Sequence, residues 1–401
     1  MPKKKKQRKS WKERLRERKI KYQRALETHR MKLEKELQEK SKRASRRKLL
    51  LASLCFTILI LSIYGAVQYT IPTSDSYEGS NQTQGQTQTN QTESSPSLYG
   101  SDAILILPDG SIYPSTAPIT KSGDNYYVVE EDLTLPIKVG KDHIVIDGAG
   151  HTLKGRKIYD SRGIDLAGRK NVTVKNLKIE SFDYGVYLNS TSDCTIMENE
   201  FMENYVAVWI SFSSNNKVLA NSIANISLSQ GYGIWVKNST GNLVDGNNVT
   251  LYSYGIYLGY SDDNVISENI LKENRVGVYL YRSSDNMLSG NKLINNVDSG
   301  IHMLMASNNI IKLNQLSTNG VALSLDNSNN NLIYNNNFLN NTQQVYNNNS
   351  TNIWNGSLDE GGNYWSDYTG TDENGDGIGD TPYLIDEKNE DQYPLISEKL
   401  Q

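Results

Sequence analysis

The chain has 401 residues, 37% of them hydrophobic, and its formal net charge of −3 at pH 7 conceals two parts of opposite charge. Residues 1–48 hold 22 Lys and Arg against 6 Glu, which leaves 20 basic and 39 acidic residues for the rest of the chain. This division excludes a protein that lies in one uniform environment. The two cysteines exclude a disulfide framework, because Cys55 lies in a long apolar run and Cys194 lies in the repeat region.

Residues 1–48 are predicted to form a basic amphipathic helix on the cytoplasmic side of a membrane. Six apolar residues fall within an arc of roughly 80° when they are placed on a helix; they are Trp11, Leu15, Tyr22, Leu26, Leu33 and Leu37. Such a face suits an anionic membrane surface or a short coiled coil. Nucleic-acid binding is the alternative, but a basic helix next to a membrane span is more often a lipid-facing anchor, so no nucleic acid is expected as a partner.

Residues 49–68 are predicted to be a single transmembrane helix that acts as an uncleaved signal anchor. The run from Leu49 to Val67 carries no charge and is long enough to span a bilayer. Arg46, Arg47 and Lys48 precede it, which places the N-terminus in the cytoplasm and the rest outside the cell. A cleaved signal peptide is the alternative, but the charged leader is too long for one. Residues 69–98, rich in Ser, Thr, Gln and Asn, are predicted to be a disordered linker.

Residues 99–355 are predicted to form an all-β, right-handed parallel β-helix with coils of about 22 residues. Residues 171–331 divide into blocks of 23, 23, 26, 22, 22, 23 and 22 residues, each with three short apolar runs and a Ser/Asp/Asn turn. Leucine-rich repeats share this period, but these blocks are β-branched and lack a helical stripe. One expected column, whose amides would form a ladder, holds Asn176, Asn199, Asn221, Asn247, Asn269, Asn291, Asn314 and Asn336. A second column holds Gly163, Gly185, Gly233, Gly255, Gly277, Gly300 and Gly320, with Ala207 in the remaining coil.

Alternation along the strand after each column glycine predicts an outward aromatic on five consecutive coils. Val186 and Leu188 should point into the core, so the residue between them should point out. The same position along the stack gives Asp165, Tyr187, Trp209, Trp235, Tyr257, Tyr279, His302 and Ala322. We call the five aromatic members, Tyr187, Trp209, Trp235, Tyr257 and Tyr279, the aromatic wall. Pyranose rings stack on such side chains, and the alternative is a wall that only stabilises its own sheet. Tyr184, Tyr232 and Tyr254 should lie nearby.

Other chemistry-bearing residues give weaker indications. Asp193, Asp262, Asp263 and Asp285 occupy turn positions that hold Asn, Ser or Gly in other coils, so they indicate turns rather than the paired acids of a glycosidase. Asp165 and Asp183 lie near the wall without forming an evident catalytic set. Copper is not expected, because His302 should point outward while Met303 points into the core.

Residues 356–401 are predicted to cap the β-helix and to hold a calcium loop. Asp372, Asn374, Asp376, Gly377 and Asp380 match positions 1, 3, 5, 6 and 9 of such a loop, and the carbonyl of Ile378 would supply position 7. Position 12 is Tyr383 rather than Glu, so a bidentate ligand must come from elsewhere, and Asp386 is the candidate. The alternative is an acidic, glycine-rich turn.

The segment "IVIDGAGHTLKG" (residues 144–155) and the blocks that follow resemble the NosD-like right-handed β-helix proteins of the carbohydrate-binding and sugar-hydrolase (CASH) type. The ending "GGNYWSDYTGTDENGDGIGDTPYLID" is similar to that of exported archaeal members. The resemblance implies a β-helix, and for the founding member an accessory role in copper-enzyme maturation. From the residues we expect a membrane-anchored, extracellular protein that binds a glycan or cell-surface polymer without catalysis. The alternatives are a polysaccharide hydrolase or lyase and a copper-maturation accessory.

Overall fold

The computed structural model describes residues 103–399, apart from the side chains of residues 229 and 230. Every regular element in these residues is a β-strand, and none of them is a helix long and apolar enough to cross a membrane. The predicted amphipathic helix, transmembrane helix and linker, residues 1–48, 49–68 and 69–98, lie outside the described residues.

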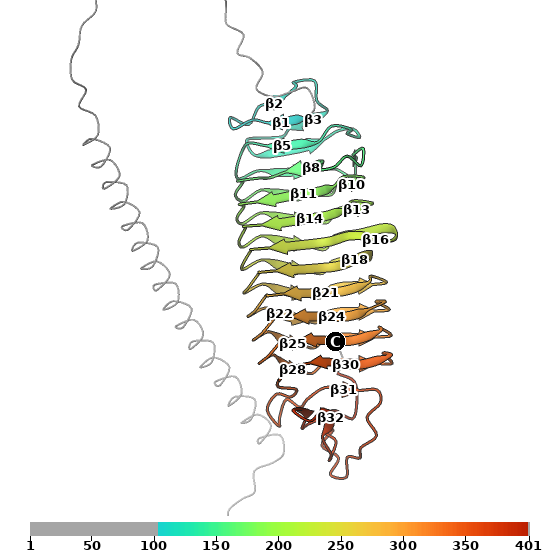
Figure 1. The fold of residues 1–401 in the computed structure, drawn as a ribbon. Coiled ribbons are helices and arrows are strands. Elements are labelled where there is room, and N and C mark those ends of the chain that lie inside the picture. Colours follow the sequence, from blue (N-terminus) through green and yellow to red (C-terminus); the bar gives the residue numbers. More distant parts are fainter. Residues whose placement is uncertain (1–102, 400–401) are drawn as a thin grey trace, which may run out of the picture. The chain divides into compact units, whose positions relative to one another are not determined.

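Successive coils stack as a parallel β-helix with three faces (Figure 1). The first face consists of β4 (Tyr126–Val129), β6 (Val145–Asp147), β9 (Thr173–Lys175), β12 (Thr195–Met197), β15 (Lys217–Leu219), β17 (Leu243–Asp245), β19 (Val265–Ser267), β22 (Met287–Ser289), β25 (Ile310–Lys312) and β28 (Leu332–Tyr334). The second consists of β7 (Thr152–Lys154), β10 (Lys178–Glu180), β13 (Glu200–Met202), the first parts of β16 (Ser222–Lys237) and β18 (Asn248–Gly259), β20 (Ile270–Lys272), β23 (Lys292–Ile294), β26 (Gln315–Ser317), β29 (Asn337–Leu339) and β31 (Tyr364–Trp365).

The third face carries the aromatic wall. It consists of β1 (Ile104–Ile106), β5 (Ile137–Val139), β8 (Arg162–Asp165), β11 (Tyr184–Asn189), β14 (Val206–Ser211), the later parts of β16 and β18, β21 (Val276–Tyr281), β24 (Ser299–Leu304), β27 (Val321–Asp326) and β30 (Gln343–Asn348). Antiparallel strands are confined to the two ends of the stack; they are β2 (Ile112–Tyr113), β3 (Ile119–Lys121), β32 (Tyr383–Asp386) and β33 (Asn389–Asp391).

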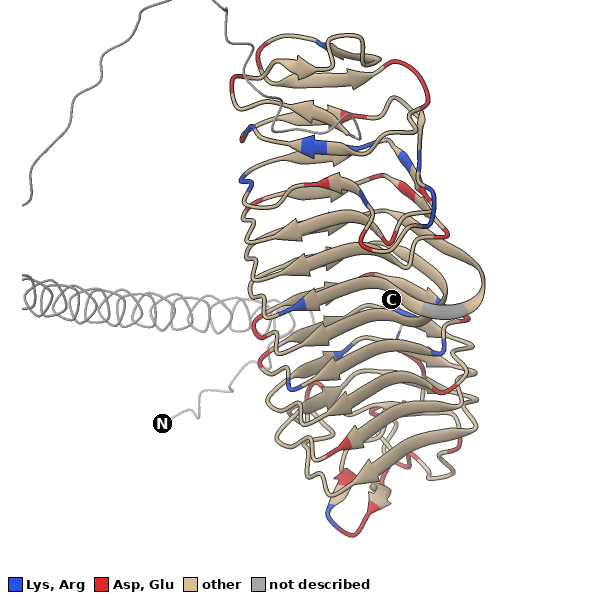
Figure 2. Cartoon of the chain, turned by 45° about the horizontal axis from the view of Figure 1, so that its top comes forward, with Lys and Arg blue, Asp and Glu red and all other residues tan. Residues whose placement is uncertain are grey.

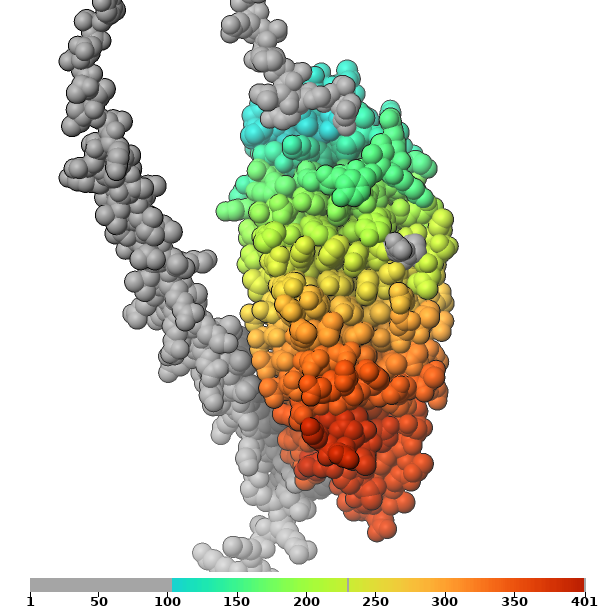
Figure 3. All heavy atoms as spheres, in the orientation of Figure 1, coloured from blue at the N-terminus to red at the C-terminus, as the bar shows by residue number. Residues whose placement is uncertain are grey.

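The hydrophobic core lies inside the coils, because each strand turns alternate side chains inward. Ile196 pairs with Val218 of the next coil, and both are fully buried. On the second face Leu271 pairs with Leu293 in the same way. The coils therefore add one apolar layer after another, and they appear as bands of successive colour in Figure 3. This arrangement confirms the predicted fold for the described residues.

Asparagine side chains tie the coils together at three corners. In the predicted ladder each amide Nδ2 donates to the Oδ1 of the following coil, through Asn199, Asn221, Asn247, Asn269, Asn291, Asn314, Asn336 and Asn363. Two further ladders, which the sequence analysis missed, pass through Asn216, Asn242, Asn264, Asn286, Asn309, Asn331 and Asn352, and through Asn274, Asn296, Asn319 and Asn341. The prediction that Asn176 belongs to the first ladder is wrong. In the coil before Asn199 the ladder position is occupied by Leu177, which has no amide side chain. Leu177 therefore contributes only its backbone N–H, which donates to Asn199 Oδ1.

The predicted glycine column is confirmed from Gly163 to Gly300 and is wrong at its last member. A Cβ on Gly255 would lie 2.7 Å from the carbonyl oxygen of Gly277, so the coils leave no room for a side chain at that level. The residue above Gly300 is Ala322 rather than Gly320, because β27 pairs Val321 with Ser299. Ala322 is therefore buried, and Ser324 takes the outward position next to His302.

Candidate functional site

The five residues of the aromatic wall lie side by side on the outer surface of the third face. The strand register pairs Tyr187 with Trp209, Trp209 with Trp235, Trp235 with Tyr257, and Tyr257 with Tyr279. All five side chains are half-buried, while Val186 and Leu188 point inward and are fully buried. The predicted outward placement is confirmed; the role in carbohydrate binding stays a prediction.

The wall is continuous because neighbouring rings touch from coil to coil. Tyr187 and Trp209 are parallel with centroids 6.4 Å apart, and Trp209 meets Trp235 edge-to-face at 4.3 Å. Trp235 meets Tyr257 at 5.6 Å, and Tyr257 stacks on Tyr279 at 5.1 Å. Four steps between strands at about 4.8 Å give the wall a length of roughly 19 Å. That length accommodates several consecutive rings of an extended ligand.

Tyr184, Tyr232 and Tyr254 widen the wall on one side, as expected. Tyr232 stacks on Trp235 at 4.1 Å and on Tyr254 at 5.3 Å, and Tyr184 meets Trp209 edge-to-face at 5.4 Å. Burial raises the pKa of Tyr184 to about 12, and it also raises the pKa of Tyr232. The hydroxyl groups of Tyr184 and Tyr232 are therefore protonated at neutral pH and are able to donate a hydrogen bond.

The two indole N–H groups at the centre of the wall are buried without a hydrogen-bond acceptor among the described residues. Nε1 of Trp209 and Nε1 of Trp235 both show this arrangement. The edge-to-face contact of the two indoles offsets part of the cost of leaving polar groups unpaired. A ligand on the wall would thus meet ring surface at Trp209 and Trp235 more than it would meet free N–H donors.

Charged residues mark the N-terminal end of the wall. The Arg162 guanidinium lies 3.8 Å from the centroid of the Tyr187 ring, and it also pairs with Asp165 at 3.1 Å and Asp160 at 3.4 Å. Asp183 accepts a hydrogen bond from the backbone N–H of Asp160 at 2.8 Å. Each of these carboxylates is thereby held by a neighbour. A depression of about 380 Å³ opens beside them, bordered by Tyr159 and other residues of the adjoining coils.

The C-terminal end of the wall is marked by His302, whose ring meets Tyr279 at 4.8 Å. Its Nε2 lies 3.3 Å from Asp326 Oδ2, which is within ion-pair distance if the ring is protonated, but it has no hydrogen-bond partner among the described residues. Burial lowers the pKa of His302, and the nearby Asp326 only partly opposes this effect. Met303 is buried, as predicted, whereas Met305 is exposed at the following corner. His302 and these methionines therefore do not converge on one point.

The turn aspartates belong to the repeat, as predicted. Asp193, Asp263 and Asp285 all have left-handed backbone conformations, with φ of 59°, 58° and 57°. Asp and Asn tolerate this conformation better than other side chains that carry a Cβ. Asp262 accepts a hydrogen bond from the backbone N–H of Ser284 in the next coil.

The predicted calcium loop folds around Asp372. Its carboxylate accepts hydrogen bonds from the backbone N–H groups of Gly375, Asp376 and Gly377 at 2.7–3.2 Å. Within the part of the chain that the structure describes, no three His, Cys, Asp or Glu side chains gather at metal-binding spacing. Asp386, the candidate for the bidentate ligand, instead accepts hydrogen bonds from Asn347 and Asn389. Calcium binding by Asp372, Asn374, Asp376, Ile378 and Asp380 stays a prediction.

Removal of calcium tests this prediction. If the loop binds Ca²⁺ in the folded state alone, a chelator should lower the melting temperature, and Ca²⁺ at a hundredfold excess over its dissociation constant should restore about 2.7 kcal/mol of stability. Differential scanning calorimetry of the full chain and of Asp372→Ala measures the effect. An unchanged melting temperature after chelation would contradict the prediction.

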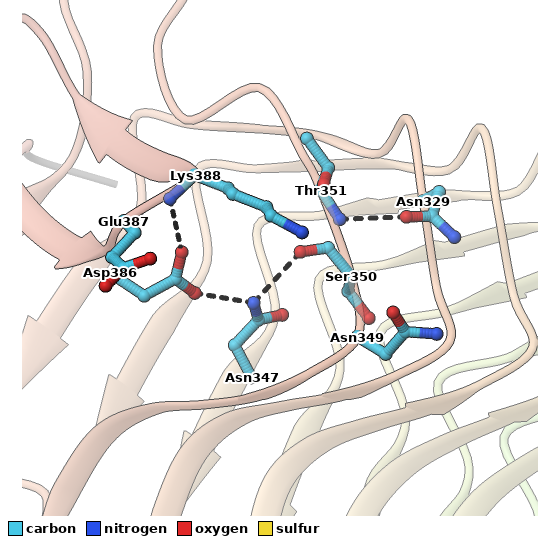
Figure 4. A pocket seen from close by; sticks show the side chains of 8 residues that line it. All are labelled: Asn329, Asn347, Asn349, Ser350, Thr351, Asp386, Glu387 and Lys388. Carbon is cyan, nitrogen blue, oxygen red and sulfur yellow. Dashed lines mark hydrogen bonds between the residues drawn. The ribbon is translucent and has the colours of Figure 1, made fainter.

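A polar depression of about 390 Å³ lies where the last coil meets the β32–β33 hairpin (Figure 4). Figure 4 shows Asp386 between Asn347 and the backbone of Lys388, and it receives hydrogen bonds from them at 2.6 and 2.8 Å. Asn389, which ends the Asn216–Asn352 ladder, also donates to Asp386 at 2.9 Å. The principal role of these groups is to close the C-terminal end of the stack.

Two protein-family models match parts of the chain. Residues 213–370 match the family described as "Periplasmic copper-binding protein (NosD)", and residues 137–249 match "Right handed beta helix region". No curated protein matches the sequence.

Solved structures with a related arrangement include three proteins. The periplasmic alginate epimerase AlgG is 17% identical, with a TM-score of 0.41, 59% of this chain covered and 68% of the other. The A-module of Azotobacter vinelandii mannuronan C-5 epimerase AlgE4 is 16% identical, with a TM-score of 0.42 and coverages of 61% and 81%. The tailspike protein of E. coli bacteriophage HK620, in complex with a pentasaccharide, is 15% identical, with a TM-score of 0.44 and coverages of 58% and 52%.

The two family matches together cover residues 137–370, which contain the asparagine ladders and the aromatic wall. The matched segments consist of stacked parallel strands, as the description "Right handed beta helix region" implies. Residues 137–370 therefore form a right-handed parallel β-helix, and the chain is similar over residues 213–370 to the NosD family.

Proposed function

We propose that this protein is a membrane-anchored, extracytoplasmic surface protein that binds a glycan along the aromatic wall without catalysis. The observation that carries the proposal is the unbroken contact of rings from Tyr187 to Tyr279 on the outer surface of the third face. Outward sheet positions are ordinarily polar, so five consecutive large aromatics exceed what a stable sheet requires. The apolar faces of pyranose rings are matched by such a surface.

The polar groups beside the wall support the same proposal. Protonated tyrosine hydroxyl groups supply hydrogen-bond donors and acceptors at the edge of the ring surface. The carboxylates of Asp165 and Asp183 already bind Arg162 and a backbone N–H, so they favour positioning of a ligand over acid–base chemistry. The membrane anchor rests on the sequence of residues 49–68 and is part of the proposal.

Two tryptophan variants test the proposed function. Trp209→Ala and Trp235→Ala should each weaken binding to the recognised glycan about tenfold, because each removes the central stacking surface. The full chain should first be screened against a panel of polysaccharides and oligosaccharides, and the affinity for each binder then measured by titration calorimetry.

Tyr346→Ala is the matched control. Tyr346 occupies the same outward column two coils beyond His302 and is 44% exposed. This variant should bind as the parent protein does. Melting curves of all variants exclude unfolding as the cause of lost binding. Absence of binding to any glycan, or binding that survives both tryptophan substitutions, would overturn the proposal.

A further inference from the structure

We propose that the glycan is acidic, and that its carboxylate or sulfate groups bind Lys237 and Arg282 at one side of the aromatic wall. This inference rests on the proposed function, whose ligand class it narrows. It follows from the position of the two cations, from their lack of acidic partners and from the distribution of charge over the third face.

Lys237 lies directly beside the centre of the wall. It follows Trp235 by two residues on β16, so both side chains point to the same outer surface. Its Nζ lies 6.0 Å from the Trp209 ring and 5.9 Å from the Trp235 ring. Among the described residues its Nζ has no hydrogen-bond or ion-pair partner, so its three N–H donors are free for an anion.

Arg282 stands two coils further along on the same side. Its guanidinium lies 5.7 Å from the ring of Tyr260 and 5.4 Å from that of Tyr281, and these rings meet edge-to-face at 5.3 Å. No carboxylate of the described chain pairs with it. The two aromatic contacts hold the planar guanidinium in place while its N–H groups remain available to a carboxylate or sulfate.

Acidic residues are absent from this side of the wall between the coils of Tyr187 and His302, and the first one in these columns is Asp326 in the next coil. Two outward columns contain Lys237 and Arg282, and over six coils their members are Asn189, Ser190, Ser211, Phe212, Lys237, Asn238, Gly259, Tyr260, Tyr281, Arg282, Leu304 and Met305. None of these is Asp or Glu, although the chain beyond residue 48 has 39 acidic and 20 basic residues. Figure 2 shows that charged residues gather mainly in turns and near the ends of the stack.

Arg162 serves as an internal comparison. It also lies over a wall ring, that of Tyr187, but two carboxylates neutralise it, Asp160 and Asp165. Arg275, on the opposite side of the wall, pairs with Asp298 at 2.6 Å. Lys237 and Arg282 are thus distinguished from Arg162 and Arg275 by having no ion-pair partner among the described residues. A ring that stacks on Trp235 or Tyr257 would place anionic substituents at its edge within reach of these two residues.

The experiment compares one acidic oligosaccharide with its neutral counterpart. Titration calorimetry of the full chain should use a uronic-acid oligomer, the same oligomer after reduction of its carboxyl groups, and a sulfated oligosaccharide. The uronic-acid or the sulfated ligand should bind at least about tenfold more tightly than the neutral one, and this preference should shrink as salt rises. Preference for only one of the two acidic ligands identifies which anion is recognised.

Substitutions at the two cations provide the second measurement. Lys237→Gln and Arg282→Gln should each weaken binding of the acidic ligand about fivefold and leave that of the neutral ligand unchanged. Lys292→Gln is the control, because Lys292 is exposed on β23 of the second face. This substitution should change neither the affinity for the acidic ligand nor that for the neutral ligand. If acidic and neutral ligands bind equally tightly, and the binding of both is weakened by the Trp209 and Trp235 substitutions, this inference is overturned and the proposed function stands. If none of the three ligands and no member of the wider glycan panel binds, both this inference and the proposed function are overturned.

Discussion

Replacement of Asn269 by alanine should destabilise the protein by about 3–5 kcal/mol, because it leaves several buried polar groups without partners. Asn269 is fully buried. Its Oδ1 accepts hydrogen bonds from the backbone N–H and the Nδ2 of Asn247 at 2.9 and 3.0 Å. Its Nδ2 donates to the carbonyl oxygen of Val244 and to Oδ1 of Asn291, both at 2.9 Å. Alanine removes all four hydrogen bonds at once and interrupts the ladder in the middle of the stack.

Urea unfolding followed by far-ultraviolet circular dichroism measures the change. Asn248→Ala is a matched control. Asn248 directly follows the ladder residue Asn247, one coil before Asn269, but its side chain is exposed at the start of β18. Its substitution should change the unfolding free energy by less than about 0.5 kcal/mol. Equal losses for the two variants would show that the ladder contributes no more than an exposed asparagine.

Replacement of Asp391 should have an effect of similar size at the C-terminal end of the same ladder. The last residue of the ladder, Asn363, points its N–H groups toward this end. One oxygen of the Asp391 carboxylate accepts hydrogen bonds from Asn363 N at 2.7 Å and from Asn363 Nδ2 at 3.3 Å. The same oxygen accepts from Trp365 Nε1 at 2.9 Å, and the other accepts from Tyr393 N at 3.1 Å. Asp391 is fully buried. Asp391→Ala should therefore cost about 3–5 kcal/mol, since four donors lose a charged acceptor.

The raised pKa of Asp391 also predicts that the folded protein becomes less stable as the pH rises. Burial raises its pKa from 3.8 to about 6, although its hydrogen bonds act in the opposite direction. Between these two pH values the folded state holds a proton that the unfolded state has released. The contribution of this group to stability is therefore fully present below about pH 3, and it decreases by about 3 kcal/mol in total as the pH rises to about 7.

Comparison with Asp391→Asn isolates this contribution, since an amide does not titrate. The difference in unfolding free energy between the parent protein and the variant should shift in favour of the variant by about 3 kcal/mol from pH 3 to pH 7. Urea titrations at several pH values provide the measurement. A difference that stays constant over this range would contradict the raised pKa.

The sequence predicted the elements that recur at a fixed period. Tyr187, Trp209, Trp235, Tyr257 and Tyr279 were placed correctly because strand alternation and coil length determine both the direction and the neighbours of each side chain. The two additional asparagine ladders had the same signal, since Asn242, Asn264 and Asn286 recur at 22-residue intervals. The ladder from Asn216 to Asn352 was missed because its residues lie in turns and were read only as turn formers.

Features outside the period were not predictable in this way. Gly320 resembled the next column glycine, but it lies only 20 residues after Gly300, and the full 22-residue coil brings Ala322 above Gly300. Asp391 lies 28 residues beyond Asn363, with no repeat to align the two. The contact of Arg162 with Tyr187 joins two different outward columns, and its distance depends on side-chain conformations that no periodicity specifies.

Hydroxyl-radical footprinting of the full chain, with and without a saturating glycan found by the screen, tests the central claim most directly. Oxidation of the wall residues Tyr187, Trp209, Trp235, Tyr257 and Tyr279 should fall when the glycan binds. Tyr113, which is 47% exposed on β2, should be oxidised equally in both samples. Protection at Tyr159 or around the C-terminal depression, with the five wall residues unchanged, would contradict the assignment of glycan binding to the wall.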